Sequence, residues 1–311
     1  MTRHLLEVDD VRPEELAEIL RIARESPSRP LEGLGVALVM GLPSARTRNA
    51  TEMAVHDLGG HAVAMSGAEL GIDSRESAED VACTLAQYHR VICARIADHG
   101  VLGRMAAAID AGGFEVPVVN LLSGEAHPVQ ALADLLTLAD VAGGPAALAS
   151  QRIAWVGDAN NVARSVTLAA VGVGMHVSLA APEGHRLEAD DAERIARYAE
   201  AAGLGGRLEE VGSPLQAVDG ALAICTDVWV SMGQEAEHDQ RVAGFRGYQI
   251  DESLLAAAGA DAVLLHCLPA HRGEEVTDGA LDGPRSRIWL QAAHRRTAMR
   301  GLLTWLTAGA R

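Results

Sequence analysis

Short apolar runs alternate with helix-like segments along most of this chain, and no other feature constrains the fold as strongly. Before residue 143, runs rich in valine, alanine and isoleucine predict strands at 36–40, 61–65, 90–94 and 116–120. Helical periodicity and capping residues predict helices over 10–25, 46–59, 76–88, 98–110 and 128–138. The polar, glycine-containing stretch 66–75 is predicted to be a loop. Strands that alternate with helices form parallel sheets with crossover helices.

The alternation starts again after the break Gly143-Gly144-Pro145. Strands are predicted at 153–156, 175–180, 207–211, 221–225 and 262–266, and helices over 161–170, 189–202 and 292–306. The chain has 311 residues, which is enough for two domains of about 150 residues each. The sequence therefore predicts an α/β protein with two doubly wound parallel-sheet domains. Ligands of such sheets bind at the carboxyl ends of the strands.

Composition excludes several classes of function. The 26 basic and 42 acidic residues give a formal charge of −16, which argues against nucleic acid or an anionic membrane as the main partner. All basic residues except the histidines are arginine, so a lysine Schiff base, lysine-bound pyridoxal phosphate and a Walker lysine are excluded. The four cysteines form no C-x-x-C pair, which argues against a disulfide framework or a zinc knuckle. Without a signal-peptide core or a long apolar run, the protein is expected to be soluble and cytoplasmic.

A candidate anion site follows the first predicted strand. Ser44 is placed to cap the next helix, and Arg46, Thr47 and Arg48 lie in its first turn. Free backbone N–H groups and the helix dipole favour an anion at such a position. Arginine adds a planar fork of donors that suits phosphate. The alternative is a solvated basic helix start.

Two further polar segments follow predicted strands. His127 and Gln130 open a helix, where a histidine either donates to a carbonyl or phosphate oxygen or simply caps the helix. Asp227 and Ser231 lie four residues apart and suit a ligand that carries an ammonium group. The alternative for Asp227 is an exposed loop aspartate. A tryptophan at 229 in a loop that we expect to be exposed favours a binding role.

Two segments contain residues that suggest other chemistries. His266 and Cys267 suggest a nucleophile, or a metal site together with His271. Adjacent residues on an extended chain point to opposite faces, however, and a fourth ligand at zinc-type spacing is missing. The turn at Gly157 has one glycine where a dinucleotide-binding G-x-G-x-x-G turn needs three, which makes a nicotinamide dehydrogenase a weak alternative.

Together these segments resemble the aspartate/ornithine carbamoyltransferase family from about residue 30 to the end of the chain. The stretch 44–48 is similar to the family's S-T-R-T-R, and 127–137 to H-P-x-Q-x-L-A-D-L-L-T. The stretch 156–162 resembles V-G-D-x-N-N-V, 227–233 resembles D-x-W-x-S-M-G, and 266–270 matches H-C-L-P-A. The last two motifs indicate ornithine, rather than aspartate, as the acceptor. The resemblance implies transfer of the carbamoyl group of carbamoyl phosphate to the side-chain amine of L-ornithine.

The resemblance also implies an architecture. Residues 1–142 would bind carbamoyl phosphate, 143–290 would bind ornithine, and the helix at 291–311 would pack back on the first domain. The active site would lie in the cleft between the domains, at the subunit borders of a homotrimer. Neither a metal nor a cofactor is implied.

Individual residues receive roles from the same resemblance. The residues implied to hold carbamoyl phosphate are Ser44, Ala45 (through its backbone), Arg46, Thr47, Arg95, His127, Gln130, Cys267, Leu268 and Arg295. Those implied to act on the reacting groups are Arg46, Arg95, His127, Gln130, Cys267 and Arg295. Those implied to bind ornithine are Asn161, Asp227, Ser231 and Met232.

The chain departs from the family pattern at several positions. Ala45 replaces the family's second hydroxyl, the stretch 49–52 replaces x-S-F-E, and His294 replaces an asparagine. The stretch 69–75, where the family brings a side chain into the neighbouring subunit's site, has no match to the usual glutamine. These departures leave open a carbamoyltransferase for another amine, such as putrescine or a modified ornithine, and a non-catalytic carbamoyl phosphate binder.

Overall fold

The computed structural model describes residues 2–231 and 233–308, and the chain forms two compact units. The first unit comprises Met1–Ala133 and Ala293–Arg311, and the second comprises Asp134–Ala292. The boundaries fall inside two helices, α6 (Pro128–Ala142) and α13 (Ile288–Thr307). Among the described residues, no helix is both long and apolar enough to cross a membrane.

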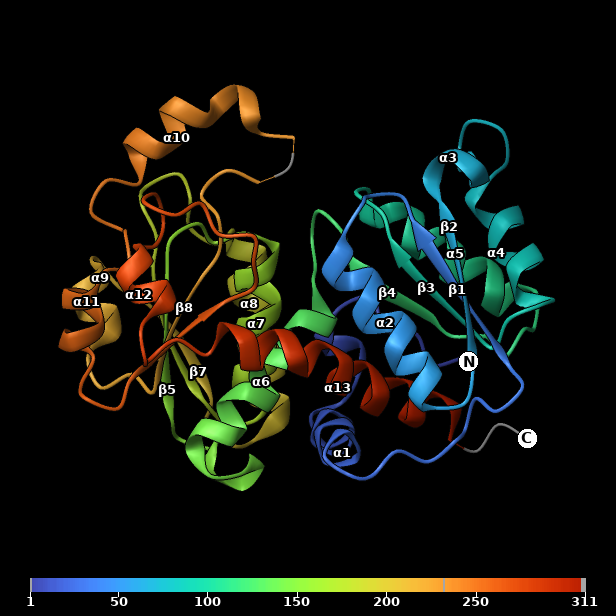
Figure 1. Ribbon diagram of the computed structural model, residues 1–311, viewed down its shortest axis with the longest axis horizontal. Helices are drawn as coiled ribbons and strands as arrows, with labels where there is room; N and C mark the ends of the chain where they lie inside the picture. The colour runs from blue at the N-terminus through green and yellow to red at the C-terminus, as the bar shows by residue number, and fades with distance from the viewer. Residues whose placement is uncertain (1, 232, 309–311) are drawn as a thin grey trace. The chain divides into compact units, whose positions relative to one another are not determined.

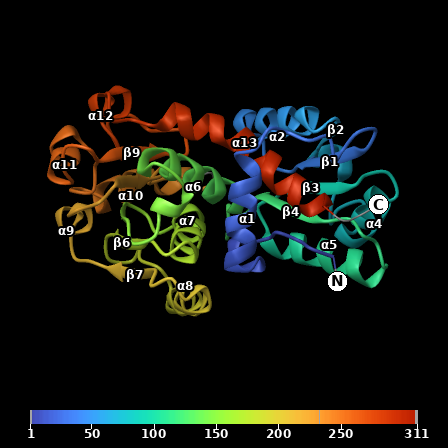
Figure 2. The same ribbon diagram turned by 90° about the horizontal axis from the view of Figure 1, so that it is seen from below.

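The first unit is built on a four-stranded parallel sheet with the order β2-β1-β3-β4. Its strands are β1 (Gly35–Met40), β2 (His61–Ser66), β3 (Val91–Arg95) and β4 (Val118–Leu122). Its helices are η1 (Val8–Asp10), α1 (Pro13–Ala23), α2 (Ala45–Asp57), α3 (Gly67–Leu70), α4 (Ala78–Ala86) and α5 (His99–Ala111). Figures 1 and 2 show α2 and α5 on opposite faces of this sheet. Apolar side chains of α4 and α5 form one core with the buried residues of β1 and β3.

The second unit repeats this plan with a five-stranded parallel sheet of order β7-β6-β5-β8-β9. Its strands are β5 (Arg152–Val156), β6 (His176–Ala180), β7 (Arg207–Glu210), β8 (Ala223–Thr226) and β9 (Val263–His266). Its helices are η2 (Pro145–Ala147), α7 (Asn161–Gly172), α8 (Ala189–Ala202), α9 (Pro214–Val218), η3 (Glu235–Glu237), α10 (His238–Gly244), α11 (Glu252–Ala257) and α12 (Asp278–Asp282). The core on one face joins α9, α11 and α12 to β5 and β8, while α7 and α8 cover the other face (Figure 1).

The predicted fold class is confirmed, since both sheets are parallel and doubly wound. The prediction of a loop over 66–75 was wrong at its start, because the side chain of Ser66 caps the short helix α3 and Glu69 completes the capping box. The helices α9 to α12 were not predicted. They contain five to seven residues each, which is too short for a helical period to show in the sequence.

Helix α13 packs on the first unit, as predicted. A Cβ built on Gly301 would come within 2.6 Å of the Ala23 side chain and 2.8 Å of the Ile19 carbonyl oxygen, so α13 and α1 pack backbone to backbone at this point. Arg296 forms an ion pair with Asp57 at the end of α2. The C-terminal helix is thereby joined to both α1 and α2.

Each sheet has a point at which the strand order reverses. In the first unit, the chain moves outward from β1 to β2 on one side and to β3 and β4 on the other. In the second unit, the corresponding reversal lies between β5 and β8. In doubly wound sheets, ligands bind outside the carboxyl ends of the strands at such a reversal. These two positions are therefore where functional side chains are expected.

Candidate functional site

The reversal in the first unit carries the predicted anion turn. Ser44 caps α2 by accepting a hydrogen bond from the Thr47 backbone N–H at 3.3 Å, as the sequence predicted. Ala45 and Arg46 are the first two residues of α2, so their backbone N–H groups lie at the positive end of the helix dipole. Both residues are exposed. Arg48 instead donates to Glu52 one turn further along the helix.

Arg95 reaches the same place from the neighbouring strand. It is the last residue of β3, rather than the first residue after it, and only 7% of it is exposed. The backbone N–H of Leu42 donates to the Arg95 carbonyl at 3.2 Å, which joins the anion turn to the end of β3. A Cβ on Gly41 would lie 3.1 Å from the same carbonyl oxygen, so the two segments approach closely.

A buried hydrogen-bonded group connects three distant segments behind this turn. Arg295 donates to Gln130 Oε1 at 2.5 Å and to Thr47 Oγ1 at 3.2 Å. Ser44 Oγ lies 3.2 Å from the same Thr47 hydroxyl. Because Thr47, Gln130 and Arg295 are each at most 5% exposed, their geometry is fixed by the surrounding packing. The structure thus brings these predicted residues together.

His127 lies among the arginines in a strongly positive environment. Burial, followed by the charges of Arg295, Arg95 and Arg46, lowers the pKa of His127 well below 6.5. The imidazole is therefore neutral near pH 7 and offers one N–H donor. Three guanidinium groups around a neutral donor form a site for a small anion with more than one negative charge.

The reversal in the second unit centres on Asp227, which directly follows β8 and is 7% exposed. It accepts hydrogen bonds from Asn160 Nδ2 at 2.9 Å and from Cys267 Sγ at 3.0 Å. The oxygen of the Asn160 side chain accepts from the N–H groups of Val162 and Ala163 and so caps α7. The carboxylate is thus held between the segments that follow β5, β8 and β9.

The asparagine that bonds to Asp227 is not the one implied to bind ornithine, and that role of Asn161 stays a prediction. Asn161 was predicted to bind the ligand, whereas the hydrogen bond to Asp227 comes from Asn160, and Asn161 is the first residue of α7. The sequence did contain a signal for Asn160, because asparagine is a preferred N-cap residue, and an amide whose oxygen caps the helix still has its nitrogen to donate.

The segment after Asp227 is held in place by aromatic packing. Trp229 is 4% exposed and stacks on Phe245 with ring centroids 5.3 Å apart, so the prediction of an exposed tryptophan was wrong. Arg241 donates to the Trp229 carbonyl at 2.6 Å and pairs with Asp158 at 2.5 Å. Ser231 lies beyond this support and is half-buried. Met232, the other predicted residue here, lies outside the described residues.

The segment after β9 is held by a buried pair that the sequence did not reveal. His266 Nε2 lies 3.0 Å from Glu275 Oε1, and both side chains have no exposed surface. His266 Nδ1 accepts from the Leu268 N–H at 2.9 Å, which assigns the proton to Nε2. Leu268 adopts the left-handed conformation, with φ at 60°, which is uncommon for a leucine. The pair therefore fixes a strained turn beside Cys267.

Within the described part of the chain, two groups of side chains have the composition of metal ligands. One comprises Asp227, His266 and Cys267, and the other comprises His271, Glu274 and Glu275. His266 and Cys267 have different partners, Glu275 and Asp227, as expected for adjacent residues that face opposite ways. The Cys267 thiol donates to Asp227, while His266 is bonded to Glu275 and to the Leu268 N–H, so these adjacent residues do not form a Cys–His pair of the kind that activates a nucleophile.

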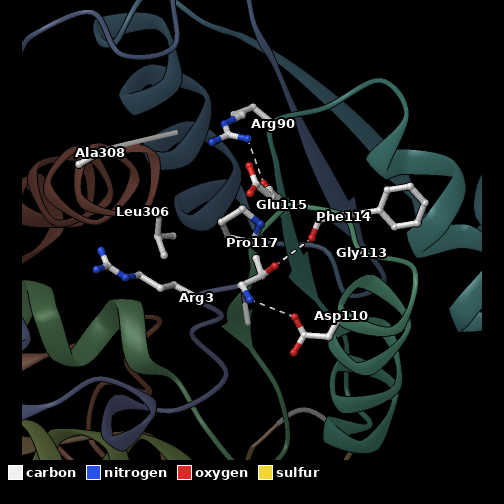
Figure 3. A pocket seen from close by; sticks show the side chains of 10 residues that line it. Arg3, Arg90, Asp110, Gly113, Phe114, Glu115, Pro117, Leu306 and Ala308 are labelled. Carbon is white, nitrogen blue, oxygen red and sulfur yellow. Dashed lines mark hydrogen bonds between the residues drawn. The ribbon is translucent and has the colours of Figure 1, made fainter. Parts of the chain in front are cut away.

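A separate hollow in the first unit has a volume of about 400 Å³ and is shown in Figure 3. Arg90 and Arg3 reach into it, but Arg90 donates to the Glu115 carbonyl at 3.0 Å and Arg3 lies over the Trp305 ring. Asp110 accepts from the Thr2 backbone N–H at its rim. Positive and negative side chains are balanced there, so this hollow lacks the excess of positive charge found around His127.

Comparisons with known proteins agree with the geometry of both units. Residues 3–140 match the carbamoyl-P binding domain of aspartate/ornithine carbamoyltransferase, and residues 149–306 match its Asp/Orn binding domain. A protein of Mycolicibacterium gilvum named ornithine carbamoyltransferase is 43% identical over 316 residues, with 98% of this chain and 99% of the relative covered. A protein of the same name from Rhodococcus opacus is 42% identical, with 99% of this chain and 97% of the relative covered.

Solved structures give the same result. Ornithine carbamoyltransferase from Pyrococcus furiosus superposes with a TM-score of 0.90 at 38% identity, covering 99% of this chain and 98% of that one. The enzyme of the same name from Thermus thermophilus gives a TM-score of 0.85 at 37% identity, covering 98% of this chain and 99% of that one. With both domains matched along nearly the whole length, the chain belongs to the aspartate/ornithine carbamoyltransferase family.

Proposed function

We propose that this chain transfers the carbamoyl group of carbamoyl phosphate to the side-chain amine of L-ornithine, giving L-citrulline and phosphate. The observation that carries the proposal is the hydrogen-bonded group of Thr47, Gln130 and Arg295 behind the α2 N-terminus. It supplies oriented donors for a phosphate and for a polar group attached to it. Membership of the family and the names of its relatives support the same reaction.

In the first unit, the phosphate would be bound at the start of α2. Its oxygens would accept from Ser44, from the Ala45 backbone N–H, and from the guanidinium groups of Arg46 and Arg95. Replacement of the family's hydroxyl by Ala45 leaves the backbone donor in place, because the N–H at the first helical position has no partner within the helix.

The carbamoyl group would contact His127 and Gln130, whose side chains follow β4 at the start of α6. Attack by the amine converts the carbamoyl carbon to a tetrahedral centre, and negative charge develops on its oxygen. The N–H of a neutral His127 and the guanidinium of Arg295 would stabilise that charge. Phosphate then leaves with the bonding electrons, and the attacking nitrogen loses a proton.

In the second unit, Asp227 would bind the α-ammonium end of ornithine, with Asn161, Ser231 and Met232 as further contacts. Cys267 and Leu268 would lie beside the carbamoyl group, in the turn that the His266–Glu275 pair holds. The attacking amine must be neutral, so activity is expected to rise with pH until that amine is deprotonated. Holding both substrates in place supplies much of the rate acceleration.

Three further expectations remain predictions. The family resemblance predicts a homotrimer, which light scattering of the purified protein would test. The reaction requires no metal or cofactor, so chelator-treated protein is expected to retain turnover. A cytoplasmic location and a role in arginine biosynthesis are the expected context.

The proposal is tested by a product assay. Purified protein is incubated with carbamoyl phosphate and, separately, with ornithine, putrescine, N-acetylornithine and aspartate, and both the ureido product and free phosphate are measured. Citrulline formed well above the other products supports the proposal. A different preferred amine would retain the carbamoyl phosphate site but reject ornithine as the acceptor. Carbamoyl phosphate binding without any product would favour a non-catalytic binder.

A matched pair of variants separates the anion site from general effects of charge. Arg46→Ala is expected to abolish inhibition by phosphate together with turnover. Arg48→Ala on the same helix, whose side chain pairs with Glu52, is expected to leave both nearly unchanged. Equal effects of the two substitutions would contradict the assignment of Arg46.

A further inference from the structure

A second group of polar side chains lies beyond the turn that carries Cys267. The group comprises one imidazole and two carboxylates, those of His271, Glu274 and Glu275. Each residue offers one ligand atom, and these three atoms lie within 4.8 Å of one another. All three residues lie in the loop between β9 and α12, so their spacing depends on this unit alone. None of them contacts a substrate in the proposed reaction, although Glu275 pairs with His266 and so supports the turn beside Cys267.

The hydrogen-bonding state of this group is unusual. Among the described residues, no group hydrogen-bonds to His271 Nδ1, Glu274 Oε2 or Glu275 Oε2, although all three atoms are buried. The Glu275 side chain has no exposed surface, and its other oxygen accepts from His266 Nε2 and from the His271 N–H. Glu274 Oε2 lies 3.6 Å from His271 Nδ1, which is too long for a hydrogen bond. A buried carboxylate oxygen without a donor, such as Glu275 Oε2, is costly, and a bound cation would remove that cost.

We infer that His271, Glu274 and Glu275 form a binding site for a divalent transition-metal ion such as Zn²⁺ or Co²⁺. An imidazole nitrogen with two carboxylates is a donor set for such ions, whereas Mg²⁺ and Ca²⁺ take oxygen ligands. The site is independent of the proposed function, because the metal takes no part in carbamoyl transfer.

The distances are compatible with coordination. Metal–ligand bonds of about 2.0–2.2 Å require ligand atoms no more than about 4.4 Å apart. His271 Nδ1 and Glu274 Oε2 already lie 3.6 Å from one another. The side chains of His271 and Glu274 are 40% and 26% exposed, so they have room to adjust toward Glu275, which is fully buried.

His238 would position one of the ligands. Its Nε2 lies 3.0 Å from Glu274 Oε1, the oxygen on the far side of the carboxylate from His271. Hydrogen bonds of this kind orient a ligating carboxylate, and their loss typically weakens metal binding about 10- to 100-fold. His238 is the first residue of α10, so an occupied site would connect α10 to the loop after β9.

The test is a titration of chelator-treated, full-length protein with Co²⁺, followed by calorimetry and by the visible spectrum of the ion. One equivalent per chain is expected. His271→Gln and Glu274→Gln are each expected to weaken binding at least about 10-fold, the lower end of the loss for a positioning partner. His176→Gln, at a half-buried histidine of the same unit that contacts Arg207, is the matched control and is expected to bind like the parent.

The alternatives give distinct results. Binding at the group of Asp227, His266 and Cys267 would produce a thiolate-to-cobalt charge-transfer band that persists in His271→Gln, and this would overturn the inference. An absence of stoichiometric binding up to millimolar Co²⁺, or equal binding by all variants, would also overturn it. Citrulline formation is measured in parallel, and its presence without Co²⁺ shows that failure of the metal site leaves the proposed function intact.

Discussion

Replacement of Arg295 by methionine would test the proposed anion site most directly. The guanidinium of Arg295 donates to Gln130 and Thr47 and is 5% exposed, so no solvent molecule readily substitutes for it. One hydrogen bond to a charged group contributes about 1.5–3 kcal/mol. The variant Arg295→Met is therefore expected to lose roughly 10- to 150-fold in kcat/KM for carbamoyl phosphate.

The same substitution has a second, independent effect. After burial, the charge of Arg295 is the largest cause of the lowered pKa of His127. Removing that charge is expected to raise the pKa of His127 toward its ordinary value of 6.5. Steady-state kinetics with phosphate as inhibitor measures the first effect, and an NMR titration of the His127 ring protons measures the second.

Arg296→Met is the matched control for this experiment. Arg296 is the next residue of α13, but it forms an ion pair with Asp57 and its side chain is 45% exposed. Exposed ion pairs contribute about 0–1 kcal/mol to stability, and this pair is remote from the anion turn. If Arg295→Met and Arg296→Met both stay within about twofold of the parent in kcat/KM, the reasoning about the buried donor group is refuted.

Four other predictions follow from the described contacts. Because the folded protein holds His127 neutral while the unfolded chain protonates it near pH 6.5, stability is fully present above that pH and is lost as pH falls below it. The slope is up to about 1.4 kcal/mol per pH unit, and denaturant unfolding should show it in the parent but not in His127→Gln. Asp227→Asn is expected to raise KM for ornithine about 10-fold or more, while the inhibition constant for phosphate stays unchanged. An equal change in both constants would contradict the assignment of Asp227 to ornithine binding. Asn160→Ala removes the cap of α7 and should lower thermal stability by about 0.5–2 kcal/mol in addition to raising that KM. Gly301→Ala forces a methyl group against Ala23, so calorimetry should show a loss of about 1–3 kcal/mol in the free energy of unfolding. An unchanged melting temperature would contradict the close packing of α13 on α1.

Local features of the sequence predicted most of the fold. The predicted helix over 189–202 has the same limits in the structure, and Ser44 caps α2 as expected. Strand periodicity, helix caps and glycine breaks depend on neighbouring residues only, so they can be recognised along the chain. The same reasoning missed the short helices of the second unit. It also predicted wrongly that Trp229 is exposed, because its burial depends on a contact with Phe245 in another segment.

The residue types of the candidate site can be read from the amino-acid sequence, in five motifs that each follow a predicted strand or begin a predicted helix. Which of these side chains meet depends on the folding of distant segments onto one another. Arg295 reaches residues 165 and 248 positions earlier in the chain, and Asp227 bonds Asn160 and Cys267 from two other segments. The physical reason is that the order and register of parallel strands set the neighbours at the carboxyl edge of each sheet, and that order is not a local property of the chain.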